Sequence, residues 1–308
     1  MLKISLRQIT YFTAAAETGS IAEAARLLNV AQPSVSWAIL KMEEMLGLDL
    51  FLRQHAKGVT LTPAGHRLLP EARAILRMAE EFEHKALSQA EELGGVLTVG
   101  VYSTLAAVFL PPVIAELARR HPRMRIEIFE DTVDRVLAEL NAGRVEIALA
   151  YDVDLPAEMV KLRICTAMPY VLLPGGHRLL ERSAVSLTEL QDDPFVLLGS
   201  RPAGQYFLSL FDIVGVRPNI VLTSPSFEVV RSLVAQGLGY SVLVTRPQSD
   251  LTYDGARVYP RPLKDDLPEH NVCTVRAGAT RMTRRCAAFQ ETCLQLFGGR
   301  VSPMHYPP

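Results

Sequence analysis

The residues best suited to chemistry form a short polar group between positions 32 and 41. Amide, hydroxyl and ammonium groups bond to base edges and phosphates when they project from the first turns of a helix in the DNA major groove. The group comprises Gln32, Pro33, Ser34, Ser36, Trp37 and Lys41. This pattern predicts a DNA-reading helix.

Two helices that meet at an angle would hold this group in place. Ser20 and Glu23 predict a capping box at the start of the first helix, and Asn29 can adopt the turn that ends it. Pro33 suits the first turn of the second helix, which Gly47 ends. Apolar residues recur on one face of this second helix at steps of four, three and four: Val35, Ile39, Met42 and Leu46.

The flanking segments complete a winged helix-turn-helix. An upstream helix, capped by Ser5 and Gln8, adds to a small core. Residues 50–52 and 59–61 can pair as the strands of a wing, and Arg53 would meet phosphates there. Six basic and five acidic side chains through residue 65 leave this domain nearly neutral. Affinity would therefore depend on where the cations lie, on helix N-termini and on more than one DNA-binding domain.

A long helix is predicted from Thr62 and Pro63, which suit its N-cap and its first position. Its apolar stripe follows coiled-coil spacing: Leu68, Ala72, Ile75, Ala79, Phe82, Ala86, Ala90 and Leu93. A stripe of that length extends roughly 38 Å, which a domain of some sixty residues cannot cover. We therefore expect two chains to pair through this helix, which ends at Gly94 and Gly95.

The larger half of the chain alternates strands with helices, which predicts parallel sheets with helices on both faces. Two α/β lobes are expected, with a ligand in the cleft between them. The boundaries are 1–62 for the DNA-binding domain, 63–94 for the linker helix and 95–298 for the two-lobed ligand-binding domain. Its first lobe is predicted at 95–167 and 268–298 and its second at 168–267, followed by a disordered tail at 299–308.

Several polar residues are predicted at strand ends that would face this cleft. The candidates for effector binding are Ser103, Thr104, Thr132, Ser200, Arg201 and Phe227. Hydroxyls and backbone N–H groups at helix starts favour an anion, and Arg201 can bind a carboxylate through two hydrogen bonds. Simple N-capping is the alternative role for Ser103 and Thr132, and core packing is the alternative for Phe227.

Composition narrows the functional classes. The chain has 308 residues, 49% of them hydrophobic and 21% charged, which is typical of a globular protein with an ample core. No apolar run suggests a membrane span or a signal peptide, so we expect a cytoplasmic protein. Four cysteines without metal-ligand spacing are expected to be reduced and buried. The sequence predicts no cofactor, no metal site and no catalytic residue.

These motifs together resemble the LysR-type transcriptional regulators. The resemblance rests on residues 6–53, on LTPAGHRLLPEA, and more loosely on LPPVIAELARRHP, LNAGRVEIALA and VAQGLGYSVL. It implies a regulatory domain like type II periplasmic binding proteins, a small effector between its lobes, operator DNA as partner and a homodimer that forms a homotetramer. One departure is Trp37, since the family most often has an arginine there. A peroxide-sensing branch uses a reactive cysteine pair, but no cysteine here maps onto it.

Two other functional classes remain open at this stage. A sensor without DNA binding would use its N-terminal module only to oligomerise. An α/β enzyme is disfavoured, because residues 237–242 lack the third glycine of a nucleotide-binding motif and no P-loop or G-x-S-x-G motif occurs.

Overall fold

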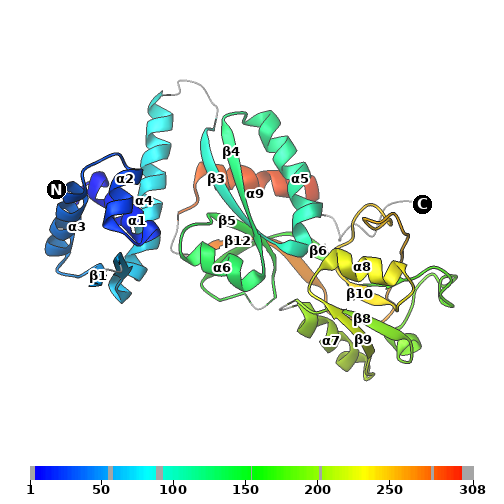
Figure 1. The fold of residues 1–308 in the computed structure, drawn as a ribbon. Coiled ribbons are helices and arrows are strands. Elements are labelled where there is room, and N and C mark those ends of the chain that lie inside the picture. Colours follow the sequence, from blue (N-terminus) through cyan, green and yellow to red (C-terminus); the bar gives the residue numbers. More distant parts are fainter. Residues whose placement is uncertain are drawn as a thin grey trace.

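The computed structural model describes residues 4–54, 58–87, 93–153, 155–200, 203–278 and 281–299. A three-helix module with a wing comes first, a long helix follows, and two α/β lobes form the rest (Figure 1). The predicted fold class is confirmed. Within the described ranges, no helix combines the length and the apolar character that a membrane span requires.

The N-terminal module contains α1 (Leu6–Thr18), α2 (Ile21–Leu27) and α3 (Gln32–Leu46). Ser5 and Gln8 form the predicted capping box, and Asn29 adopts a left-handed conformation with φ 53°. At α2, Ser20 Oγ accepts from Glu23 N as predicted, but the Glu23 carboxylate pairs with Arg26. The predicted second half of that capping box was therefore wrong.

The wing consists of β1 (Phe51–Gln54) and β2 (Gly58–Leu61), which pair antiparallel. The next helix, α4 (Pro63–Leu87), starts as predicted, since Thr62 Oγ1 accepts from Gly65 N at 3.0 Å. Residues 88–92 lie outside the described residues, and so does the predicted stripe member Ala90. Nothing is described beyond Gly299 of the predicted tail.

The predicted exposed stripe along α4 needs correction in its first half. Leu69 and Ala72 are buried, and Leu68 packs against the core of the N-terminal module. These side chains therefore complete their own domain. Beyond them, α4 exposes Ile75, Met78 and Phe82.

The first lobe is built on a five-stranded sheet in the order β4-β3-β5-β12-β6. Its strands are β3 (Gly95–Tyr102), β4 (Met124–Asp131), β5 (Ile147–Tyr151), β6 (Met159–Ala167) and β12 (His270–Ala277). Its helices are α5 (Ser103–Arg120), α6 (Val133–Asn141) and α9 (Arg284–Phe297). Strands β3, β4 and β5 are parallel, but β12 is antiparallel to its neighbours. The expectation of a purely parallel sheet was wrong.

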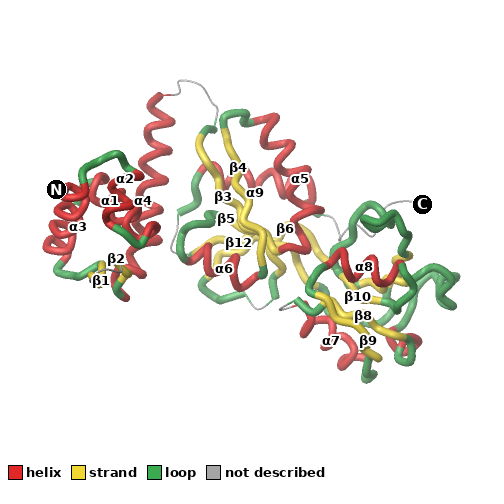
Figure 2. Tube along the Cα trace, viewed as in Figure 1, coloured by secondary structure: helices red, strands yellow, loops and turns green. Residues whose placement is uncertain are grey.

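The second lobe contains β7 (Tyr170–Leu173), β8 (Pro194–Leu198), β9 (Asn219–Ser224), β10 (Ser241–Leu243) and β11 (Tyr259–Pro262). Strands β8 and β9 are parallel, whereas β10 and β11 both pair antiparallel with β7. A bridge from Phe195 to Tyr240 joins the two groups of strands. Helices α7 (Ala203–Val214) and α8 (Phe227–Ala235) connect the strands, and a 3₁₀ turn spans Leu187–Leu190 (Figure 2).

The strand order places a topological switch in each lobe. The chain passes from β3 to β4 on one side and then returns to β5 on the other side of β3. In the second lobe, β9 and residue Tyr240 before β10 likewise flank β8. Ligands in open α/β sheets bind outside the carboxyl ends of strands at such points. The ends of β3 and β8 are therefore the expected walls of a cleft.

Candidate functional site

The first turns of α3 present a polar surface on the N-terminal module. Gln32, Pro33 and Ser34 are exposed and Ser36 is half-buried, while Trp37 is 63% exposed. The opposite face of the helix is buried in the core through Val35, Ala38, Ile39 and Met42. No side chain caps the N-terminus of α3, but Pro33 has no N–H group and Ser34 N donates to Ala31 O at 2.9 Å. The side chains of this turn, more than its backbone N–H groups, therefore remain available to a partner. Such a turn can meet base edges and phosphates together.

Lys41 lies on the same helix but its charge is partly engaged. Its Nζ is 2.6 Å from Glu44 Oε2 and 5.8 Å from the centre of the Trp37 ring. An exposed pair of this kind contributes little free energy, so a phosphate can replace Glu44. Arg53 belongs to β1 by its backbone, but its side chain lies outside the described residues.

The wing is held at a fixed angle to α3. Glu43 Oε1 accepts hydrogen bonds from Leu50 N at 2.8 Å and Phe51 N at 3.1 Å. On the other strand, Val59 N donates to Gly19 O at 2.9 Å. The carboxylate of α3 therefore orients β1, and the turn after α1 orients β2.

Five of the six predicted effector residues line one groove between the lobes, of about 1510 Å³. They are Ser103, Thr104, Thr132, Ser200 and Phe227. Arg201 lies outside the described residues. Ser103 and Thr132 are exposed at the rim, whereas Thr104 is only 8% exposed.

The rim does not resemble an anion site. Ser103 Oγ donates to Asp131 O at 3.3 Å, and Asp131 Oδ1 accepts from Thr132 N at 2.7 Å. The Asp131 carboxylate therefore occupies the N–H group that an anion would use, and its charge would repel one. Thr132 occupies the N-cap position of α6, but its side chain makes no capping hydrogen bond.

A smaller cavity of about 40 Å³ lies at the carboxyl ends of the strands, against the groove. Its polar lining groups come from Tyr102, Thr104, Tyr151, Tyr206, Thr245 and His270. Tyr102 and Tyr151 end β3 and β5, whereas Tyr206 lies on α7 and Thr245 follows β10. Both lobes thus contribute to one cavity.

Two hydroxyl pairs join the lobes across this cavity. The hydroxyls of Tyr102 and Ser200 are 2.9 Å apart, and the hydroxyl of Tyr151 bonds to Thr245 Oγ1. Burial raises the pKa of Tyr102, Tyr151 and Tyr206, so all three phenols remain neutral at physiological pH. They can donate hydrogen bonds but cannot balance a ligand's charge.

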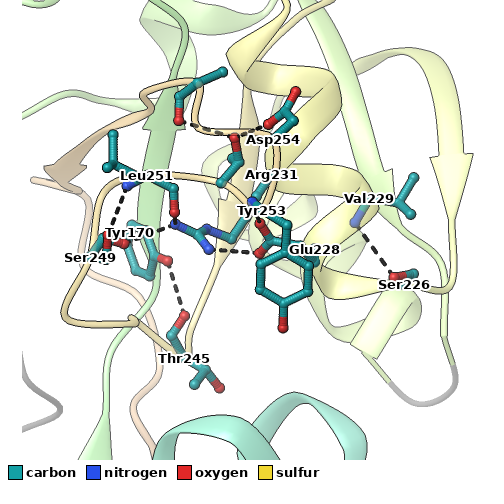
Figure 3. A network of polar contacts seen from close by, with 12 residues as sticks. Tyr170, Ser226, Glu228, Val229, Arg231, Thr245, Ser249, Leu251, Tyr253 and Asp254 are labelled. Atoms are coloured by element: carbon teal, nitrogen blue, oxygen red, sulfur yellow. Dashed lines mark hydrogen bonds and ion pairs between the residues drawn. The ribbon is translucent and has the colours of Figure 1, made fainter.

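The segment that carries Thr245 is fastened to α8 by a polar network (Figure 3). Arg231 pairs with Glu228 at 2.6 Å and donates to the carbonyl oxygens of Ser249 and Leu251 at 2.9 and 3.0 Å. Glu228 Oε1 also accepts from Tyr253 N at 2.7 Å. Because α8 begins at Phe227, the network fixes this wall of the cleft relative to Thr245.

Sequence reasoning missed Tyr206, Thr245 and His270 as cavity residues. His270 lies close to the predicted crossing at Pro268, which was the available signal. Tyr206 lies on α7, but nothing in its sequence spacing distinguishes it from a core aromatic residue.

Comparisons with known proteins agree with this two-part architecture. The model of the bacterial regulatory helix-turn-helix protein, lysR family, matches residues 6–66, and that of the LysR substrate binding domain matches residues 90–298. The HTH-type transcriptional regulator AlsR of Bacillus subtilis is 30% identical over 81% of this chain and 85% of its own length. A probable hydrogen peroxide-inducible genes activator of Mycobacterium avium is 32% identical over 80% and 78%.

Solved structures support the same conclusion. The structure of HinK, a LysR family transcriptional regulator from Pseudomonas aeruginosa, is 36% identical, with a TM-score of 0.65 over 96% of this chain and 99% of that one. These relatives and neighbours are regulators, and none of them argues for the enzyme that the sequence left open. The chain belongs to the LysR family of bacterial transcriptional regulators, which bind DNA, respond to small molecules and are not enzymes.

Proposed function

We propose that this regulator reads its operator through the first turns of α3 and responds to an effector held between its two lobes. The observation that carries the DNA-reading proposal is the polar, exposed and uncapped start of α3. Gln32, Ser34 and Ser36 would contact base edges. Trp37 would pack on a sugar or a thymine methyl group, because an indole cannot make the paired contact to guanine that an arginine makes. The regulated DNA lies in the cytoplasm, where we expect the protein to act.

A homodimer through α4 fits the exposed side chains of that helix. Ile75, Met78 and Phe82 are 44%, 45% and 71% exposed, and they follow one another at steps of three and four. This spacing is that of a coiled-coil seam. Two copies paired there would place two α3 helices on one operator, and two such dimers would form the expected tetramer.

The regulatory half supplies a hinge for the effector response. The chain crosses between the two sheets after Ala167 and again between Pro262 and His270. We propose lobe boundaries at 95–167 with 268–298 and at 168–267. An effector that prefers one arrangement of the lobes would shift how the oligomer binds its operator, typically by 1–3 kcal/mol.

Footprinting of the DNA beside the regulator's own gene tests the proposal. Full-length protein should protect a site there, and Gln32→Ala and Ser36→Ala should each weaken binding by about ten- to a hundredfold, as loss of base contacts does. Gln205→Ala, an exposed glutamine on α7, is the matched control and should bind as the wild type does. No protected site, or unchanged affinity for both variants, would leave the non-DNA-binding sensor as the better explanation.

A further inference from the structure

The small cavity between the lobes has few groups that could balance a ligand's charge. His270 lines it, but His270 Nδ1 lies 3.5 Å from Asp152 Oδ1, so that carboxylate already balances a positive charge on the imidazole. Among the described residues that line it there is no lysine, arginine, aspartate or glutamate. Its walls are mainly aromatic and aliphatic and include Val153, Phe207, Phe227 and Leu243. Burial of a full charge in such surroundings is costly when no opposite charge compensates it.

Two hydroxyl groups in the cavity are left for a ligand. Thr104 Oγ1 and the Tyr206 hydroxyl are buried and make no hydrogen bond of normal geometry with the described residues. Thr104 also interacts with the Tyr151 hydroxyl, which is itself bonded to Thr245 Oγ1. Thr104 comes from α5 in the first lobe, and Tyr206 comes from α7 in the second. Buried polar atoms are normally bonded, so an incompletely bonded hydroxyl on each side points to a missing partner between them.

We propose that this cavity binds an uncharged single-ring compound, whose polar substituent bonds to Thr104 from one lobe and to Tyr206 from the other. The inference rests on the proposed function and names the class of its effector. It replaces the small organic anion that the sequence favoured. Aromatic side chains suit the faces and edges of a flat ring, and each hydroxyl can donate or accept a hydrogen bond.

The size of a single ring links its binding to the distance between the lobes. The cavity measures about 40 Å³, whereas a cavity of roughly 150 Å³ holds benzene. The cavity must therefore widen to hold a ring, and movement of the lobes away from each other would widen it by separating the Tyr102–Ser200 and Tyr151–Thr245 pairs. Binding thus favours a more open arrangement than the one described.

Four probes of one ring size test the charge preference on full-length protein. Phenol and benzyl alcohol are neutral, benzoate is an anion and benzylammonium is a cation. Thermal shift and titration calorimetry should show binding of at least one neutral probe, with both ions at least tenfold weaker. Thr104→Val and Tyr206→Phe should each weaken the neutral probe about three- to tenfold, as loss of one hydrogen bond does. Tyr259→Phe, at a half-buried tyrosine of β11 that lines neither the cavity nor the groove, should leave its affinity unchanged.

Several results would overturn this inference. They are equal or tighter binding of either ion, no binding of a neutral probe at millimolar concentration, and unchanged affinity in both the Thr104 and Tyr206 variants. If benzoate binds and Arg201→Ala abolishes that binding, the effector is an anion, as the sequence favoured. Operator footprinting of the ligand-free protein separates the two claims, because a retained footprint with failed probes rejects the ligand class alone, whereas a lost footprint rejects the proposed function.

Discussion

All four cysteines are buried, unpaired thiols: Cys165, Cys273, Cys286 and Cys293. Burial raises the pKa of Cys165 and Cys273 to about 11 and that of Cys286 to about 12. The thiolate is the reactive form, and roughly one thiol in a thousand is ionised at pH 8 when its pKa is 11. One relative is named for its response to hydrogen peroxide. None of these four cysteines is reactive enough to support such a response in this chain.

Thiol titration checks this argument at the residue scale. With the folded protein at pH 8, Ellman's reagent should label almost no cysteine in the time that a free thiol needs to react completely. The same protein in guanidinium chloride should react at all four positions, which controls for oxidation of the sample. Hydrogen peroxide should leave operator affinity unchanged. Rapid labelling of one or two thiols in the folded protein would reopen a redox role.

At the scale of elements, α4 has a second role besides the proposed dimer seam. Arg73 is 6% exposed, pairs with Glu17 of α1 at 2.9 Å and donates to Ala142 O at the end of α6. Arg77 Nη1 donates to Gly143 O at 2.9 Å. Gly143 has φ 67°, and a Cβ there would lie 3.3 Å from Pro70 Cα, so the close approach to α4 favours glycine. The helix thus joins the DNA-binding core to the first lobe.

Arg73→Ala should destabilise the full-length protein by about 1–3 kcal/mol, because its hydrogen bonds to a carboxylate and a carbonyl are lost. Glu17 is half-exposed and can be hydrated, which keeps the cost below that of a fully buried pair. Arg119→Ala is the matched control, since its pair with Glu116 lies at the surface, where solvent screens the charges, and should contribute little to stability. Urea unfolding measures both variants. Equal losses would mean that the Arg73 contacts do not join the two domains.

The elements that the sequence predicted well are those set by local rules. The Ser5 cap, the turn at Asn29 and the start of α4 at Pro63 each depend on neighbours a few residues away. The strand β6 was missed, because its partner β12 lies about a hundred residues further along the chain. The strand β11 was missed because it contains Pro260 and Pro262, and prolines argue against a strand.

Long-range packing also explains why α5 continues through two prolines. Prolines usually suit the first turn of a helix, yet α5 begins at Ser103, as the predicted strand end indicated, and contains Pro111 and Pro112 in its interior. Leu105, Phe109 and Leu110 of its first turns are buried in the core of the lobe. Apolar burial therefore outweighs the local cost of proline inside the helix.

At the scale of the whole molecule, the predicted site was only partly accessible to sequence reasoning. Thr104 and Ser200 could be predicted because each lies just after the carboxyl end of a strand, where ligands bind in α/β sheets. This rule applies within one lobe and needs no knowledge of the other. The small cavity instead depends on how the two lobes face each other across the hinge. Tyr206 and Tyr102, about a hundred residues apart, line it together. The hydrophobic periodicity within one segment cannot show that two residues from different lobes line the same cavity.

For the whole molecule we also predict that operator binding requires two copies of the chain. Phe82→Glu places a charge in the proposed seam, so the variant should be monomeric at micromolar concentration in sedimentation equilibrium, where the wild type is dimeric or larger. Its operator affinity should fall about a hundredfold or more, because the second module no longer binds as part of the same particle. Ile213→Glu on α7 is the matched control, since Ile213 is 55% exposed away from the seam. A Phe82→Glu variant that still dimerises would place the interface elsewhere, whereas a monomer with full affinity would show that one winged helix suffices.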